Sequence, residues 1–250
     1  MSHRICGINA VVQLHAARPH AFERLYVQAD LGAERRARLA ALLAAPPCPV
    51  ATVPAAELDR LTGGARHQGV AADVGGAGVL DEAEARRLVA AAATPLVLLL
   101  DGIQDPRNLG SCLRTANAAG VDLVVTGRSR TATLTPAVSK VASGAAELQP
   151  LAQVGNLVRF MEFLKESGVW LVGLAADAGE SLYARDLRGP TGLLLGAEGQ
   201  GLRHLTRERC DFLASLPMAG AVASLNVAVA AGVALYECRR QRLAARQAVR

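Results

Sequence analysis

The sequence predicts an α/β protein with two domains, a small N-terminal α/β domain and a larger C-terminal domain with a mostly parallel sheet. Two observations predict this architecture. At 250 residues, the chain is long enough for a small domain joined to a medium one. From Pro95 onward, short aliphatic runs alternate with helix-like segments, as in parallel sheets that helices cover on both faces. We therefore expect a first domain over residues 1–74, a linker over 75–94 and a second domain over 95–250.

The first 74 residues alternate between short helix-like and strand-like segments. In order, we expect a helix over 7–14, a strand over 24–27, a helix that ends at Pro46, a strand over 50–53, a short helix from Pro54 and a strand over 69–74. Proline ends the second helix because it lacks a backbone N–H and its ring crowds the preceding turn. Arg35 and Arg36 belong to the polar face of that helix, and Leu39 and Leu42 to the face toward the core.

Glycines mark the boundary between the two domains. Gly75 to Gly78 predict a flexible break, and residues 81–93, rich in alanine and charge, predict a bridging helix. In the second domain we expect strands over 96–100, 121–126, 169–174, 192–195 and 212–216, with a helix over 110–119. That helix should stop at Gly120, because glycine readily takes the left-handed conformation that ends helices.

Composition excludes several classes of protein. No uninterrupted apolar stretch reaches the roughly 18 residues of a membrane span. The N-terminus has no apolar segment followed by a small-residue cleavage site, so we expect a soluble, cytoplasmic protein. The five cysteines lie far apart and form no CxxC pair, so we expect neither a disulfide framework nor a metal site.

The net charge of +5 and the pI of about 9.3 indicate a polyanionic partner. Lys140 and Lys165 are the two lysines among 27 basic residues, and the other 25 are arginines. Arginine can bind phosphate and guanine edges through two parallel hydrogen bonds, which favours RNA. A compositional bias toward arginine and alanine explains the same counts. Aromatic residues make up 3% of the chain, which argues against a base-stacking platform.

Three loops that follow expected strands carry most of the candidate functional residues. In an open parallel sheet, ligands bind at the carboxyl ends of the strands, where these loops lie. In chain order, the loops are residues 101–110 with Asn108, ahead of Arg114 on the next helix, residues 196–201 with Glu198, and residues 216–226 with Ser224 and Asn226.

Each loop, taken alone, also has a structural explanation. Asn108 and Ser224 are placed to cap the helices that follow them, Glu198 suits a positive helix end, and Asn226 suits a hydrogen-bonded core position. The loop over 196–201 is not GxGxxG and has no P-loop lysine, so it does not indicate a nucleotide-phosphate cradle.

Together, the three loops resemble the motifs of the SpoU/TrmH family of RNA ribose methyltransferases, within the SPOUT superfamily. The first motif is Asn-x5-Arg at Asn108 and Arg114, the second is LGAEGQGL, and the third is LPMAG-x4-LNV, in the family's order. The similarity continues in CGINAV, HQGV, KVASGAAE and GLRHLTRERCD and covers nearly the whole chain. In these segments the chain is similar to the family's bacterial enzymes that methylate guanosine in large-subunit rRNA.

The resemblance implies a fold, a cofactor and a partner. Residues 1–74 would be an RNA-binding domain similar to certain ribosomal proteins, and residues 95–250 an α/β methyltransferase domain with a deep trefoil knot. The family works as a homodimer whose subunits complete one another's sites, with the long C-terminal helix in the interface. S-adenosyl-L-methionine (AdoMet) would lie in the knot, beside Gly196, Ala197, Leu216, Met218 and Leu225. No metal is implied.

The implied reaction is methyl transfer to the ribose 2′-hydroxyl of a guanosine in 23S rRNA, near the peptidyl-transferase loop. Arg114 would be the activating residue, arranged by Asn108, Glu198, Ser224 and Asn226. A guanidinium, whose pKa lies above about 12, is a poor base. Arg114 would therefore either bind the target's phosphate, which accepts the proton, or act as a transiently neutral guanidine.

RNA recognition is assigned to the first domain, at Arg35, Arg36, His67 and Gln68. The first alternative function is 2′-O-methylation of tRNA, and the second is a catalytically silent RNA-binding or ribosome-assembly factor. Four positions depart from the pattern of the rRNA enzymes, all outside the implied catalytic set: Asn9, Arg107, Ala221 and Ala228.

Overall fold

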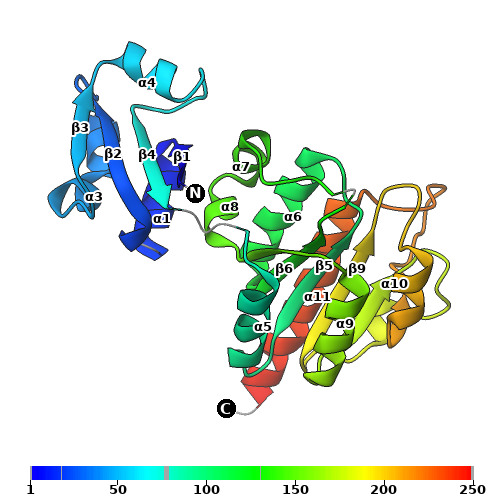
Figure 1. Cartoon of the computed structure of the whole chain (residues 1–250). Coiled ribbons are helices and arrows are strands. Elements are labelled where there is room, and N and C mark those ends of the chain that lie inside the picture. Colours follow the sequence, from blue (N-terminus) through cyan, green and yellow to red (C-terminus); the bar gives the residue numbers. More distant parts are fainter. Residues whose placement is uncertain (1, 18, 76–78, 130, 249–250) are drawn as a thin grey trace. The chain divides into compact units, whose positions relative to one another are not determined.

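The computed structural model describes residues 2–17, 19–75, 79–129 and 131–248 and divides into two compact units. The first unit comprises residues 1–78 together with Ser143–Leu148, and the second comprises Val79–Ala142 and Gln149–Arg250. Most of the first unit is blue to cyan in Figure 1, and the second runs from green to red. A short segment from the middle of the chain is therefore part of the first unit.

The first unit contains a four-stranded sheet in the order β1-β4-β2-β3. Its strands are β1 (Ser2–Cys6), β2 (Phe22–Gln28), β3 (Val50–Val53) and β4 (Val70–Gly75). Strand β4 is antiparallel to both neighbours, whereas β2 and β3 are parallel. The sequence did not predict β1, because on this edge strand the apolar Ile5 is buried while the neighbouring Arg4 is exposed, which interrupts any apolar run.

Short helices complete the first unit. They are α1 (Ile8–Ala17), α2 (Ala33–Arg38), α3 (Ala40–Ala44), α4 (Ala55–Leu61) and α8 (Ala145–Leu148), with a 3-10 turn over Pro19–Ala21. Ile8 and Val11 of α1 pack with Leu25 and Val70 of the sheet, and Leu148 of α8 packs against the same core. One helix was expected where α2 and α3 lie. The chain leaves helical geometry between them at Leu39, whose side chain is fully buried.

The second unit is built on six parallel strands in the order β10-β8-β9-β5-β6-β7. They are β5 (Leu96–Asp101), β6 (Leu123–Gly127), β7 (Leu151–Val154), β8 (Trp170–Leu174), β9 (Thr191–Gly196) and β10 (Phe212–Ala214). All six residues of β5 are buried, which confirms the expected central strand and the mostly parallel sheet. The sequence did not predict strand β7, which is LAQV.

Helices cover both faces of this sheet (Figure 1). They are α5 (Glu82–Ala91), α6 (Pro106–Ala119), α7 (Pro136–Ala142), α9 (Leu157–Glu166), α10 (His204–Arg209) and α11 (Val227–Ala248), with a 3-10 turn over Leu182–Ala184. Val89 of α5 and Phe160 of α9 join one buried cluster with Val97 and Leu99 of β5. Helices α6 and α11 pack together on the other face.

The bridging helix belongs to the second unit. Helix α5 begins with a capping box, in which Asp81 accepts from the backbone of Glu84 and Glu84 accepts from the backbone of Asp81. Ala85 and Val89 are buried in the core of the second unit, although both fall within the expected linker. Of the linker residues, 76–78 lie outside the described part of the chain.

Helix α6 begins four residues earlier than expected. Asp105 caps it by accepting a hydrogen bond from the backbone N–H of Arg107 at 2.8 Å, and Pro106 occupies the first turn. The expectation that Asn108 caps this helix is therefore wrong, and Asn108 lies inside the first turn with its side chain buried. The predicted stop at Gly120 is confirmed, since this residue adopts the left-handed conformation (φ 77°, ψ 40°).

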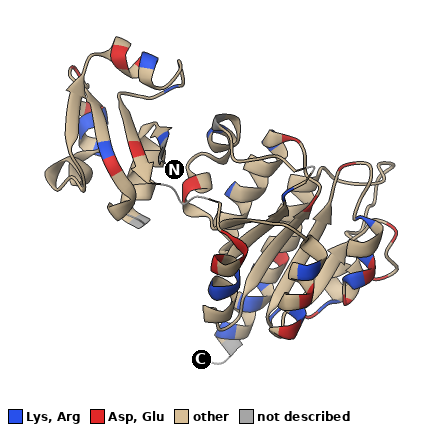
Figure 2. Cartoon of the chain, viewed as in Figure 1, with Lys and Arg blue, Asp and Glu red and all other residues tan. Residues whose placement is uncertain are grey.

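Charged side chains avoid the sheet of the second unit. Figure 2 shows them mainly on helices and loops, and among its six described strands Asp101, at the end of β5, is the one charged residue. None of the described helices combines the length and the apolar character that crossing a membrane requires.

Candidate active site

A pocket of about 790 Å³ opens at the carboxyl ends of β8, β9 and β10 in the second unit. Its wall is made by Leu174–Asp177, Leu195–Leu202, Arg207, Leu216, Met218, Ala223–Val227 and Ala230. The second and third predicted loops thus meet at one pocket, as parallel strands require. All five residues expected to hold the cofactor line it: Gly196, Ala197, Leu216, Met218 and Leu225.

Glycines shape the loop after β9 where it lines the pocket. The backbone N–H of Gly201 donates to the carbonyl of Ala197 at 2.8 Å, which closes a tight turn. Gly199 and Gly201 adopt left-handed conformations, with φ of 75° and 65°. A Cβ atom on Gly196 would lie 1.9 Å from the carbonyl carbon of Gly201, so only glycine fits there. These glycines let the main chain of the loop approach a ligand closely.

Asn226 joins three distant segments through its side chain. Its Nδ2 atom donates to Oδ1 of Asn108 at 3.0 Å and also to Oε1 of Glu198. Its Oδ1 atom accepts from the backbone N–H of Ala228 at 2.9 Å, so Asn226 caps α11. The expectation that Ser224 caps α11 is wrong, because the helix begins at Val227. Ser224 instead has an exposed side chain that lines the pocket.

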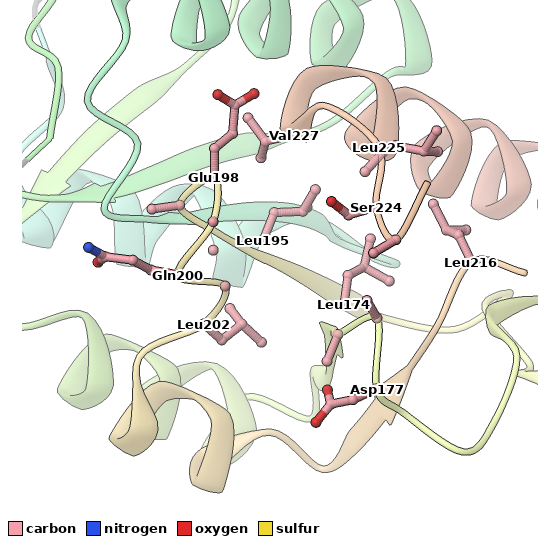
Figure 3. A pocket seen from close by; sticks show the side chains of 18 of the residues that line it. Leu174, Asp177, Leu195, Glu198, Gln200, Leu202, Leu216, Ser224, Leu225 and Val227 are labelled. Atoms are coloured by element: carbon pink, nitrogen blue, oxygen red, sulfur yellow. The ribbon is translucent and has the colours of Figure 1, made fainter. Parts of the chain in front are cut away.

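The pocket has an apolar interior and acidic groups at its edges. Leu174, Leu195, Leu202 and Leu216 line its inside in Figure 3. Asp177 and Glu198 lie at opposite sides of the pocket (Figure 3). Arg207 donates two hydrogen bonds to Asp177, at 2.8 and 3.0 Å, and these bonds lower the pKa of that carboxyl. The arrangement suits a ligand with a flat apolar part and separate hydroxyl or cationic groups.

Arg114 does not join this cluster within its own chain. It lies six residues beyond Asn108 on α6, about 9 Å along the axis and roughly 240° around it. The Arg114 side chain is exposed and is not part of the pocket wall, whereas Asn108 is buried. The structure therefore brings Asn108, Glu198, Ser224 and Asn226 to the pocket region and leaves Arg114 outside it.

Of the four residues expected to bind RNA, two have exposed side chains and two have side chains that bond within the first unit. Arg35 and Arg36 lie on α2 with exposed side chains. His67 accepts from the backbone of Gly69 through Nδ1 at 3.0 Å and donates from Nε2 to Asp59 at 3.1 Å, with 12% of its side chain exposed.

Gln68 also has an internal partner. Its Oε1 atom accepts from the backbone N–H of Ile8 at 3.1 Å, at the start of α1, and its φ is 54°, unusual for a residue other than glycine. The side chains of His67 and Gln68 are thus engaged within the first unit.

Two polar contacts near the pocket involve residues that were not predicted as site residues. Asp101 is 3% exposed and accepts from the backbone N–H of Arg203 at 3.0 Å, and its other oxygen lies 3.3 Å from the guanidinium of Arg203. The second contact is the Asp177–Arg207 pair. In both cases the acid follows or ends an expected strand, which is the signal that sequence reasoning could have used.

Comparison with known proteins agrees with the motifs. The family model described as SpoU rRNA Methylase family matches residues 95–236, and the model described as RNA 2'-O ribose methyltransferase substrate binding matches residues 4–77. The chain is 46% identical over 240 residues to the 23S rRNA (guanosine-2'-O-)-methyltransferase RlmB of Pseudomonas putida, which covers 96% of each chain.

Solved structures share the fold. The SpoU methyltransferase AviRb from Streptomyces viridochromogenes, in complex with AdoMet, matches with a TM-score of 0.79 at 24% identity, over 97% of this chain and 91% of that one. A structure that concerns 2-OH methylation of C/U34 on tRNA is 31% identical, with a TM-score of 0.56, over 61% of this chain and 99% of that one. The extent of both family models and of the identity leads to one conclusion: the chain belongs to the SpoU rRNA methylase family.

Proposed function

We propose that the protein transfers a methyl group from AdoMet to the ribose 2′-hydroxyl of a guanosine in 23S rRNA. One observation carries the proposal. The pocket and the Asn108–Asn226–Glu198 cluster occur together in a chain that is 46% identical, over 96% of its length, to a 23S rRNA (guanosine-2'-O-)-methyltransferase. A tRNA substrate has less support, since the tRNA-related structure matches only 61% of the chain.

The pocket fits AdoMet in size and chemistry. A volume of about 790 Å³ lies within the range typical of cofactor sites. Leu216 and Leu225 offer apolar surface for the adenine, and the glycine loop at Gly196 and Ala197 offers backbone groups for the ribose and amino acid. Met218 lines the same wall. When bound, AdoMet supplies an activated methyl group on a sulfonium that leaves as a neutral thioether.

The residues around the pocket would align the ribose and manage its proton. Asn226 is held by Asn108 and Glu198, so its amide keeps a fixed orientation beside Ser224 and the pocket. Such fixed polar groups position a hydroxyl for in-line attack. The guanidinium of Arg114 would bind the phosphate of the target nucleotide, and that phosphate would accept the proton; in the alternative, a transiently neutral guanidine of Arg114 would accept it.

We propose a homodimer in which Arg114 of one subunit serves the pocket of the other. The exposed position of Arg114 outside its own pocket supports this arrangement. Helix α11 also carries a stripe of exposed apolar side chains seven residues apart, with Val229 52%, Tyr236 51% and Leu243 44% exposed. Such a stripe at helical spacing suits burial against a second copy of the chain.

The remaining features of the family complete the proposal. The segment from β9 to α11 would form the trefoil knot. In support of this proposal, the loop after β9 and the loop before α11 line the same pocket. The first domain, over residues 1–74, would select the RNA through Arg35 and Arg36, while His67 and Gln68 hold the nearby loop in shape. The second unit, Val79–Ala142 and Gln149–Arg250, would carry the chemistry. A protein that modifies ribosomal RNA would act in the cytoplasm.

Labelled AdoMet and rRNA test the proposed function directly. The protein is incubated with labelled AdoMet and 23S rRNA from a strain that lacks the modification, and the labelled nucleotide is mapped. We expect a single 2′-O-methylguanosine. Label in tRNA alone would favour the tRNA alternative, and no label in any RNA would favour a catalytically silent RNA-binding factor.

A further inference from the structure

A second cavity lies beside the AdoMet pocket in the second unit. It has a volume of about 400 Å³ and opens at the carboxyl ends of β5, β6 and β7. Its wall is made by Asp101, Gly102, Gly127, Ser129, Thr131, Gly155–Val158 and Arg203–Thr206. One segment separates the two cavities, because Leu202 and Arg207 line the first and the residues between them line the second.

Two glycines, Gly127 and Gly155, line this second cavity. Neither Gly127 nor Gly155 adopts a left-handed conformation, and a Cβ atom on either would meet no atom within 4 Å. Neither backbone geometry nor packing therefore calls for glycine at these strand ends. What their missing side chains do provide is open space inside the cavity.

The polar side chains around this space include hydrogen-bond donors and an arginine. Ser129, Thr131 and Asn156 contribute polar side chains to the wall. The buried acid, Asp101, already accepts from the backbone N–H of Arg203 and forms an ion pair with its guanidinium. The Arg203 side chain remains 49% exposed, so its outer nitrogens can donate to a ligand.

We propose that the second cavity binds a nucleotide that flanks the methylated one in the RNA, through its phosphate. A phosphodiester only accepts hydrogen bonds and carries a negative charge, which matches hydroxyl donors and a half-exposed arginine. The cavity shares its dividing segment with the AdoMet pocket, so a strand that presents its ribose at one would pass the other. This subsite rests on the proposed function, because it takes RNA as the substrate.

Filling the cavity tests the subsite. Gly155→Val and Gly127→Val place side chains in the open space, and Gly189→Val is the matched control, since Gly189 also faces open space but lines neither cavity. RNA binding is measured by fluorescence anisotropy with an rRNA fragment over a range of salt concentrations. AdoMet binding is measured by calorimetry.

For both cavity variants we expect at least a tenfold higher Kd for RNA at low salt, and unchanged AdoMet binding and thermal unfolding. The slope of log affinity against log salt should fall by about 0.7 to 0.9 for each phosphate that the variant no longer binds. Gly189→Val should behave as the unaltered protein does.

If a valine variant fails to fold, a variant that adds a negative charge to the cavity wall tests the subsite instead. Ser129→Asp adds a negative charge at an exposed position of the wall, with Ser167→Asp at the far end of α9 as its control. We expect the same tenfold loss for Ser129→Asp only. If the unaltered protein methylates RNA while Gly155→Val and Ser129→Asp bind it as their controls do, the subsite is refuted and the proposed function stands. Failure of the unaltered protein to bind any RNA would overturn both.

Discussion

Replacing Asn226 by alanine tests the polar cluster, because this side chain makes three contacts at once. The cap on α11 is worth about 1 kcal/mol. The part-buried hydrogen bond to Asn108, at 3.0 Å, adds about 1 kcal/mol, since its loss leaves a buried amide oxygen without this donor. The contact with Glu198 is exposed and adds little. We therefore expect Asn226→Ala to lower the free energy of unfolding by about 2 kcal/mol, roughly thirtyfold in the folding equilibrium.

Urea denaturation followed by circular dichroism measures this loss as a shift of the midpoint at constant slope. Ser224→Ala is the matched control, because Ser224 lies two residues earlier but caps nothing. We expect its effect to stay within about 0.5 kcal/mol. The reasoning is refuted if Ser224→Ala costs as much as Asn226→Ala, or if Asn226→Ala leaves the midpoint unchanged.

Three further predictions concern single side chains. Arg114→Ala should abolish methyl transfer and leave AdoMet affinity unchanged in calorimetry, and near-normal turnover would remove this residue from the mechanism. RNA affinity should fall steeply with salt, and Arg35→Ala or Arg36→Ala should each flatten the slope by about one unit if α2 contacts phosphate. An affinity that barely changes with salt would contradict this. Burial raises the pKa of the Cys112 and Cys238 thiols to about 12, so at pH 8 Ellman's reagent should label them only after unfolding. Their rapid labelling in the native protein would contradict it.

The parallel sheet could be predicted because its central strand, β5, is buried along its whole length. The aliphatic run from Leu96 to Leu100 is typical of a central strand covered on both faces, which is what β5 is. Helix starts were harder to predict, since Asp105, Asn108, Ser224 and Asn226 are all good caps and only the path of the chain decides among them.

The sequence predicted which residues lie at the site better than it predicted which of them contact one another. The carboxyl ends of parallel strands share one edge, so loops that carry Glu198 and Asn226 had to come together. The hydrogen bond between Asn108 and Asn226 joins residues 118 positions apart, and no local sequence pattern predicts it. Sequence spacing also suggested that Arg114 shares a pocket with Asn108, but the turn of α6 directs them to different sides. The catalytic roles of these residues remain predictions.

The segment Ser143–Leu148 affects how the protein is made. Leu148 packs into the core of the first unit, yet it is translated after two strands of the second. On the ribosome, the first unit must therefore wait with an incomplete core until this segment leaves the exit tunnel. For the same reason, no single cut in the chain separates the two units, since a fragment that ends at Leu148 also carries Val79–Ala142 of the second unit. A fusion that exchanges RNA-binding domains between relatives would have to carry both pieces.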